Sequence, residues 1–220
     1  IFAPTVIQTR SVNMNSAMNE RAMDGMGKTA GVTVSQIVVS GASGLLGKKI
    51  VGALESQGFL VRRLVRGTAR SASEISWNWA SGELDAEKLS GTFAIIHLAG
   101  ESIASGRWTE DRKRLIEKSR TEGTGQIARA MARLDNGPKV LISASAIGYY
   151  GDRGDEILTE ESSQGHGFLA RVCEGWEDAT EDARKAGVRV VRMRMGIVLS
   201  RDGGVLGRML TPFRLGVGGV

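Results

Sequence analysis

The sequence predicts an α/β fold with a doubly wound parallel sheet, and two observations carry that prediction. Short apolar runs typical of buried strands alternate with longer stretches of helical periodicity, and most of the connections between them are short. A cluster of glycines also stands directly between the first apolar run and the first helical stretch. Alternating strands and helices form right-handed units with parallel strands, so we expect helices on both faces of one sheet.

Each element is expected from its own pattern of apolar residues and its own end signals. Strands are expected at 34–40, 59–65, 92–98, 139–145 and 188–193, with a short candidate strand near 75–79. Helices are expected at 45–57 and 168–186, which Gly58 and Gly187 close, and at 109–134 with interruptions at Gly123 and Gly125. The residues between 145 and 167 are expected to form a long polar loop.

The ends of the chain differ from its middle. Residues 1–33 hold four of the eight methionines without a sustained period, and we expect an irregular N-terminal extension there. Residues 34–220 are expected to form one domain. Because the chain begins at Ile1 rather than Met, we expect a processed product or a fragment. A remnant of an organellar presequence and a single cysteine favour the chloroplast stroma or the mitochondrial matrix over the cytoplasm, and disfavour secretion.

Composition excludes several classes of protein and site. One cysteine and two histidines exclude a cysteine-cluster zinc site and disfavour a histidine metal site, so no metal is expected. No apolar run approaches the ~20 residues of a membrane-spanning helix. The net charge of +5 comes from basic ends around an acidic middle, without a run of five like charges. Nucleic acid is therefore disfavoured, and the basic ends and the N-terminal extension are candidate surfaces for a protein partner.

The glycine cluster is the strongest local signal. Gly41, Gly44 and Gly47 follow the spacing G-x-x-G-x-x-G between a strand and a helix. Gly41 allows a tight turn, Gly44 lets backbone approach a pyrophosphate, and Gly47 allows close packing of the helix. Free amides and the dipole at the helix start favour an anion. The pattern predicts a Rossmann-like dinucleotide site; a glycine turn kept for packing alone is the alternative.

The nature of the nucleotide follows from two further positions. A nucleoside-triphosphate loop does not fit, since five residues separate Gly41 from Gly47 and Lys49 stands where a Ser or Thr is needed. The second strand ends at Arg66 where an NAD site usually carries a carboxylate. A guanidinium suits a 2′-phosphate, so NADP is expected, with Arg70 as a second candidate contact. A solvated arginine at a strand end is the alternative.

Several blocks of sequence resemble one known family. They are the glycine cluster, 97–103, 106–109, 143–153, 168–173, and 196–199 with 202–204. Together they resemble an extended or atypical short-chain dehydrogenase/reductase. Within that group the match is to the epimerase family of sugar-epimerase-like proteins, which was once linked to bacterial cell-division inhibition and includes the plant giant-chloroplast protein. The resemblance covers about residues 34–219.

This resemblance implies a set of functional residues. The implied cofactor contacts are Gly41, Ser43, Gly44, Leu45, Leu46, Arg66, Leu98, Ala99 and Gly100, and Ser145 would polarise the substrate. Short-chain dehydrogenases pair that serine with Tyr-x-x-x-Lys on the next helix, where this chain has Leu169 and Cys173. Leucine transfers no proton and cysteine supplies no permanent positive charge, so catalysis is not simply inherited. Relatives also continue into a smaller substrate lobe, which we expect to be absent or truncated here.

Other residues are weaker candidates for the missing chemistry. Tyr149 and Tyr150 lie four and five residues after Ser145, and either is a candidate replacement acid or a packing residue. Cys173 falls on an apolar helical face and is expected to be a buried small side chain. Polar candidates with less support are Asp152, His166, Arg107 and Trp108, and His97 is expected to be packed at a strand end.

Two functions remain open from the sequence. The first is an NADP-dependent oxidoreductase or epimerase-like enzyme that acts on an unknown small substrate, and the cofactor motif with Ser145 supports it. The second is a catalytically silent cofactor-binding subunit of an organellar assembly, which the missing Tyr-Lys pair and the N-terminal extension favour. Turnover that depends on Ser145 would separate them.

Overall fold

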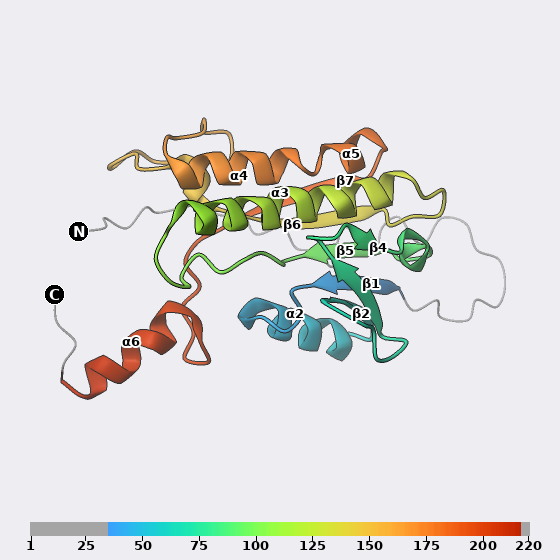
Figure 1. Cartoon of the computed structure of the whole chain (residues 1–220), viewed down its shortest axis with the longest axis horizontal. Coiled ribbons are helices and arrows are strands. Elements are labelled where there is room, and N and C mark those ends of the chain that lie inside the picture. The colour runs from blue at the N-terminus through green and yellow to red at the C-terminus, as the bar shows by residue number, and fades with distance from the viewer. Residues whose placement is uncertain (1–34, 217–220) are drawn as a thin grey trace.

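A computed structural model of the chain describes residues 35–216, which form one seven-stranded sheet with helices on both faces (Figure 1). The strand order is β4-β3-β2-β1-β5-β6-β7. Every pair from β3 to β7 is parallel, and only the short β4 runs antiparallel to β3. The predicted doubly wound sheet is therefore confirmed, with one added antiparallel strand at its edge. The extension predicted at 1–33 lies outside the described residues.

The strands lie close to the predicted runs. Their bounds are β1 Gln36–Ser40, β2 Leu60–Val65, β3 Glu74–Asn78, β4 Glu83–Leu84, β5 Ala94–His97, β6 Val140–Ala146 and β7 Arg189–Met195. Because β1, β2, β5, β6 and β7 are parallel, their carboxyl ends meet at one edge of the sheet. The order of the sheet changes direction at β1, and a ligand in such a fold binds at the carboxyl edge beside that point.

The helices agree less well with the sequence prediction. Their bounds are α2 Leu45–Ser56, α3 Glu110–Ala132, α4 Phe168–Asp178, α5 Glu181–Lys185 and α6 Gly204–Arg214, with short 3-10 turns η1 Ala86–Leu89 and η2 Ile147–Tyr150. The predicted interruption of α3 is wrong: the helix runs through Gly123 and Gly125, and Gly123 faces the ring of Trp77 and the Cβ of Trp79. Packing on the sheet outweighs the weak helix propensity of glycine there.

The single helix predicted at 168–186 is in fact two helices. The break falls at Thr180, whose buried hydroxyl donates to the carbonyl oxygen of Glu177 at 2.6 Å. That bond competes with the regular helical pattern at this position. A further difference is α6, since a helix was not expected among the C-terminal glycines.

Two hydrophobic clusters hold the layers together, one on each face of the sheet. Alternate residues of β1 serve them: Val38 packs in the cluster with α3 and α5, while Ile37 and Val39 pack in the cluster with α2. In Figure 1, α3, α4 and α5 cover one face and α2 covers the other. Burial on both faces explains why the central strands β1 and β5 are almost continuously apolar in sequence.

Candidate functional site

The glycine turn is closed by its own backbone and leaves no room for side chains at two positions. Gly41 has a φ of +68°, and a Cβ on it would lie 2.9 Å from the amide nitrogen of Ala99. A Cβ on Gly47 would lie 2.1 Å from the carbonyl oxygen of Gly41. The close packing predicted at Gly47 is therefore between the start of the helix and the backbone of the glycine turn. A Cβ on Gly44 would lie 3.2 Å from the carbonyl oxygen of Gly41.

Helix α2 begins without a side-chain cap. Its N-cap residue is Gly44, no side chain accepts a hydrogen bond there, and its first turn holds no acidic residue. Helix α3 differs, since the Thr109 side chain accepts from the amide of Arg112 and two acidic residues follow. The amides at the start of α2 are thus left for another acceptor, and the dipole there favours an anion. A pyrophosphate fits this position.

A cavity of about 390 Å³ lies at the carboxyl end of β2, one strand away from the glycine turn. Its lining includes Arg66, Thr68 and Arg70. The exposed Arg66 guanidinium lies 3.6 Å from Glu101, which also pairs with Arg112. A cluster of donors with a weakly held arginine suits a phosphate group. The lining also includes Glu74, whose carboxylate accepts a hydrogen bond from the amide of Arg70. The residue predicted to choose NADP therefore lines a cavity with two arginines and one carboxylate.

The loop after β5 is fixed against the glycine turn by a buried serine and histidine. The Ser40 hydroxyl accepts hydrogen bonds from the amides of Leu98 and Ala99 and lies 2.6 Å from Nδ1 of His97. Among the described residues Nε2 of His97 has no hydrogen-bond partner, so the contact with Ser40 is the side-chain hydrogen bond that holds this ring. Burial, with the nearby Arg120 charge, lowers the pKa of His97 to about 4. His97 is therefore neutral and positions the loop.

Ser145 lies at the carboxyl end of β6 and is buried. Its hydroxyl donates to Glu177 of α4 at 2.6 Å. The Glu177 carboxylate also accepts from Nε and Nη2 of Arg194 on β7, at 2.8 and 2.9 Å. Burial alone would raise the pKa of Glu177, but the hydrogen bonds from Arg194 and Ser145 outweigh it and lower that pKa. The carboxylate is thus ionised and its partners are fixed.

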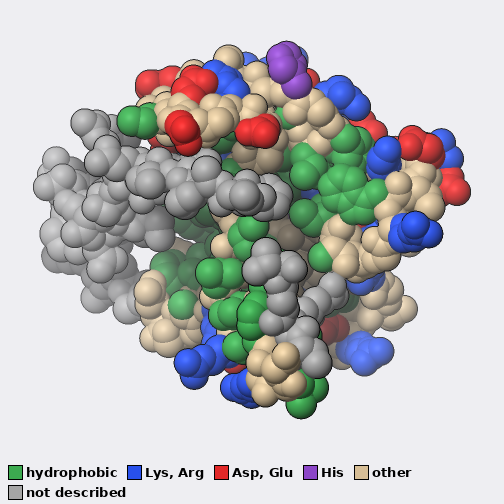
Figure 2. Space-filling view, turned by 90° about the vertical axis from the view of Figure 1, so that its left-hand side faces the viewer, with side chains coloured by type: hydrophobic (Ala, Val, Ile, Leu, Met, Phe, Trp, Pro, Cys, Tyr) green, Lys and Arg blue, Asp and Glu red, His purple; other side chains and the backbone are tan. Residues whose placement is uncertain are grey.

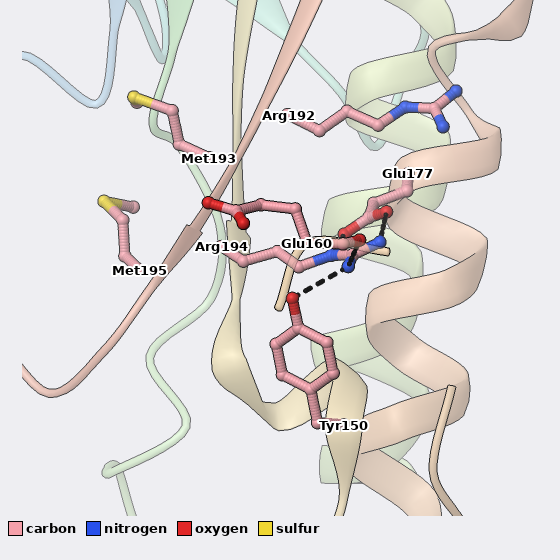
Figure 3. A pocket seen from close by; sticks show the side chains of 7 residues that line it. All are labelled: Tyr150, Glu160, Glu177, Arg192, Met193, Arg194 and Met195. Atoms are coloured by element: carbon pink, nitrogen blue, oxygen red, sulfur yellow. Dashed lines mark hydrogen bonds and ion pairs between the residues drawn. The ribbon is translucent and has the colours of Figure 1, made fainter. Parts of the chain in front are cut away.

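Arg194 also holds both tyrosines, as Figure 3 shows for Tyr150. Its Nη1 donates to the Tyr150 hydroxyl at 3.0 Å, and its guanidinium lies 3.6 Å from the centre of the Tyr149 ring. A cavity of about 400 Å³ opens beside this cluster, lined by Tyr150, Glu160, Glu177, Arg192, Met193, Arg194 and Met195. Arg194 therefore contacts both tyrosines directly and is connected to Ser145 through Glu177.

The two positions that depart from the usual pair lie beside the turn η2. A Cβ on Gly148 would lie 3.5 Å from Cβ of Leu169 and 3.7 Å from Sγ of Cys173. Burial raises the pKa of Cys173, although a hydrogen bond from the Ala146 amide opposes this. The thiol is buried and protonated, as expected from its apolar face.

The weaker candidates have structural partners of their own. Trp108 donates to the carbonyl oxygen of Ile103 at 2.8 Å and packs edge-on against Phe168. The Asp152 carboxylate accepts from the amide of Gly154 in an exposed turn. His166 and Arg107 are exposed. None of these contacts joins them to Ser145.

Glu177, Arg194 and Arg120 were missed in the sequence. Glu177 stands four residues after Cys173, on the same helical face as Leu169, so helical periodicity offered a signal. Arg194 alternates with Arg192 on β7, which was expected to end at residue 193. The contacts of these side chains depend on how α4, β6 and β7 pack against one another, and periodicity in the sequence does not predict that packing.

The face that carries this site is shown in Figure 2, where hydrophobic side chains gather in the middle. Exposed apolar residues include Ile103, Trp108, Ile197 and Leu199. Within residues 35–216, no three His, Cys, Asp or Glu side chains are grouped as a metal site. In the same part of the chain, no helix has the length and apolar character needed to cross a membrane.

Comparison with known proteins gives relatives in bacteria, plants and animals. The epimerase family protein of Mycobacterium bovis is 41% identical over 182 residues, which are 83% of this chain and 60% of that protein. The Arabidopsis thaliana protein named "Epimerase family protein SDR39U1 homolog, chloroplastic" is 32% identical over 226 residues, 99% of this chain and 64% of its own length. The chain thus spans about 60% of the length of the curated relatives it matches.

Solved structures agree with the fold. Human epimerase family protein SDR39U1 with NADPH has a TM-score of 0.72 at 29% identity, over 84% of this chain and 61% of that one. A nucleoside-diphosphate sugar epimerase from Corynebacterium glutamicum has a TM-score of 0.72 at 37% identity, over 82% of this chain and 38% of that one.

A family model describes the central part of the chain as well. The NAD dependent epimerase/dehydratase family matches residues 37–196, from β1 to the end of β7. This span contains the glycine turn, the cavity at β2 and the Ser145 cluster. The chain therefore belongs to the NAD dependent epimerase/dehydratase family, as an NAD(P)-binding protein of its atypical short-chain dehydrogenase/reductase branch.

Proposed function

We propose that the chain binds NADP at the carboxyl edge of its sheet and serves as an oxidoreductase or epimerase acting on a small substrate. One observation carries the proposal: an uncapped helix start at the glycine turn lies one strand away from an arginine-lined cavity. The proposed cofactor contacts are Gly41, Ser43, Gly44, Leu45, Leu46, Gly47, Arg66, Leu98, Ala99 and Gly100.

The choice of NADP over NAD rests on Arg66. No carboxylate stands at the end of β2, and Arg66 lines the cavity with Arg70 and Thr68. A 2′-phosphate offers a planar guanidinium two acceptors, which a ribose hydroxyl does not. The human relative whose structure contains NADPH supports this choice.

The chemistry proposed for the site depends on which groups have a proton to give. Hydride transfer is what the nicotinamide supplies when the cofactor is bound. The Ser145 proton is committed to Glu177, which leaves its oxygen as an acceptor. Tyr150 accepts from Arg194 and so keeps its own proton for a second partner. Tyr150 is therefore the proposed proton donor, with Tyr149 stacked beside the same cation and Ser145 as a supporting residue.

Cofactor choice is tested by binding measurements on Arg66→Ala. We expect NADPH binding to weaken by about tenfold or more, since a charge-assisted bidentate contact is lost, while NADH binding changes little. Arg63→Ala is the matched control, because Arg63 lies on β2, three residues before Arg66, but pairs with Glu55 of α2. Equal weakening of NADPH and NADH by Arg66→Ala would contradict the assignment.

Activity is tested by following NADPH oxidation with a panel of carbonyl compounds, including nucleotide-linked sugars. The substrate class is proposed because the Corynebacterium glutamicum relative is named a nucleoside-diphosphate sugar epimerase. We expect Tyr150→Phe to abolish turnover and Tyr149→Phe to reduce it less. Bound cofactor without turnover on every substrate would favour a catalytically silent cofactor-binding subunit instead.

Location and partners are proposed on narrower grounds. The Arabidopsis thaliana relative is named chloroplastic, which supports an organellar location, although the mycobacterial relatives have no such compartment. Import of a fluorescent fusion of the chain into isolated chloroplasts or mitochondria tests it. A protein partner at the basic ends is tested by co-purification at low and high salt.

A further inference from the structure

Arg120 of α3 is a largely buried cation that lies directly beside the loop after β5. A Cβ built on Gly100 would lie 3.3 Å from its guanidinium carbon. The same guanidinium lies 4.9 Å from the ring centre of Trp176 on α4, and Nη1 donates to the carbonyl oxygen of Ile116. Arg120 therefore occupies the space between α3, α4 and the loop that carries Leu98–Gly100.

Unlike Arg194, this arginine has no carboxylate partner among residues 35–216. Glu101, whose charge acts on Arg120, is paired instead with Arg112 at 3.3 Å and with Arg66 at 3.6 Å. Burial lowers the pKa of Arg120, which reflects the cost of holding its charge away from water. The Glu101 charge acts on Arg120 only from a distance, and no carboxylate accepts a hydrogen bond from it among the described residues, so a ligand oxygen that completes its hydrogen bonds would stabilise this arrangement.

The position of Arg120 along the sheet identifies which ligand atoms it would meet. An adenosine 2′-phosphate at Arg66 lies on the β2 side of the glycine turn, so the rest of the dinucleotide must extend across β5 toward β6. Arg120 borders the loop after β5 and lies close enough to Cys173 for each to shift the pKa of the other. Cys173 stands where the usual lysine would reach the nicotinamide ribose.

We propose that Arg120 holds the nicotinamide half of the cofactor and so replaces, from α3, the cation that is missing at position 173 on α4. This inference rests on the proposed NADP binding and goes beyond it by assigning a specific residue to the second half of the dinucleotide. The guanidinium would donate to the ribose hydroxyls or the adjoining phosphate of that half.

Binding measurements with two ligands distinguish contacts to the nicotinamide half of the cofactor from contacts to its adenosine half. NADPH contains both halves, whereas adenosine 2′,5′-bisphosphate contains only the adenosine half with its 2′-phosphate. We expect Arg120→Met, which keeps an apolar stem against Trp176, to weaken NADPH binding by about tenfold or more and leave the bisphosphate within about twofold. Arg66→Ala should weaken both ligands, and Arg120→Lys should restore most of the NADPH binding.

The matched control is Arg114→Met, an exposed arginine of the same helix that pairs with Asp111, and it should leave both ligands unaffected. A second measurement needs no variant: NADPH should shield Arg120 of the wild-type chain from phenylglyoxal, read by mass spectrometry, and the bisphosphate should not. Equal loss of both ligands in Arg120→Met, or Arg120 modified as fast with NADPH as without, overturns the proposal. Failure of the wild-type chain to bind either ligand overturns the proposed function itself.

Discussion

The hydroxyl of Ser145 donates a 2.6 Å hydrogen bond to the buried carboxylate of Glu177. This bond joins the carboxyl end of β6 to α4, and Arg194 extends the connection to β7 and to both tyrosines. The family resemblance implies a catalytic role for Ser145, and in the structure the same serine also stabilises the ion pair between Glu177 and Arg194. Substitution of Ser145 is therefore expected to lower stability as well as to affect any reaction.

Glu177→Ala should destabilise the fold by about 3–5 kcal/mol. The substitution removes the counter-ion of Arg194 and leaves a partly buried guanidinium without its two strongest bonds. Urea unfolding, followed by circular dichroism, measures the loss. Glu174→Gln is the control, because Glu174 is exposed on the same helix, and it should change stability by less than about 0.5 kcal/mol. Similar effects of the two substitutions would show that the Glu177 network contributes little.

Stability should fall as the pH is lowered from 7 to 5, and His97 should account for about 2 kcal/mol of the fall. The folded-state pKa of His97 is about 4, below the ordinary value. Between that pH and ~6.5 the histidine is therefore protonated in the unfolded chain and neutral in the folded chain. The contribution is complete above the unfolded pKa of ~6.5 and is lost as the pH falls toward 4. Urea unfolding at several pH values measures the slope.

His97→Phe should remove that slope, while His166→Gln should retain it, since His166 is exposed on the loop before α4. These are the two histidines of the chain. A slope that persists in His97→Phe and disappears in His166→Gln would contradict the assignment.

Gly41→Ala should both destabilise the fold and abolish NADPH binding. Alanine at position 41 would have to adopt a positive φ, and its Cβ would lie 2.9 Å from backbone atoms of Leu98 and Ala99. Gly58→Ala is a matched control, because Gly58 also has a positive φ but has open space around its Cβ position. It should cost about 1 kcal/mol and retain NADPH binding. Equal stability and equal NADPH binding of the two variants would show that the contact between the glycine turn and the loop after β5 is unimportant.

Gly52→Ala should stabilise the fold by about 0.5–1 kcal/mol. Gly52 is exposed in the interior of α2, and a Cβ there meets nothing within 4 Å. Alanine lowers the conformational entropy of the unfolded chain and has the higher helix propensity. Thermal unfolding checks this expectation, and a lower melting temperature than that of the wild-type chain would contradict it.

Much of the fold could be predicted because its signals are local. Apolar runs predicted every strand except β4, with each end within two residues of its observed position, and glycine spacing predicted the turn before α2. The predictions failed where packing outweighs propensity. Helix α3 continues through Gly123 because that position faces Trp77 and Trp79, and the helix after Phe168 breaks because the buried Thr180 hydroxyl bonds to the chain.

The parallel α/β sheet, the glycine turn at its carboxyl edge and the arginine at the end of β2 could all be predicted from the amino-acid sequence, since each follows from spacing along the chain. The contacts of Glu177 and Arg194 with Ser145 and Tyr150, and the position of Arg120 beside Gly100, become visible in the folded chain alone. These residues come from different helices and strands. Their pairing depends on how α3 and α4 pack on the sheet. Packing removes water from the charged groups, and the groups that replace this water come from segments far apart in the sequence.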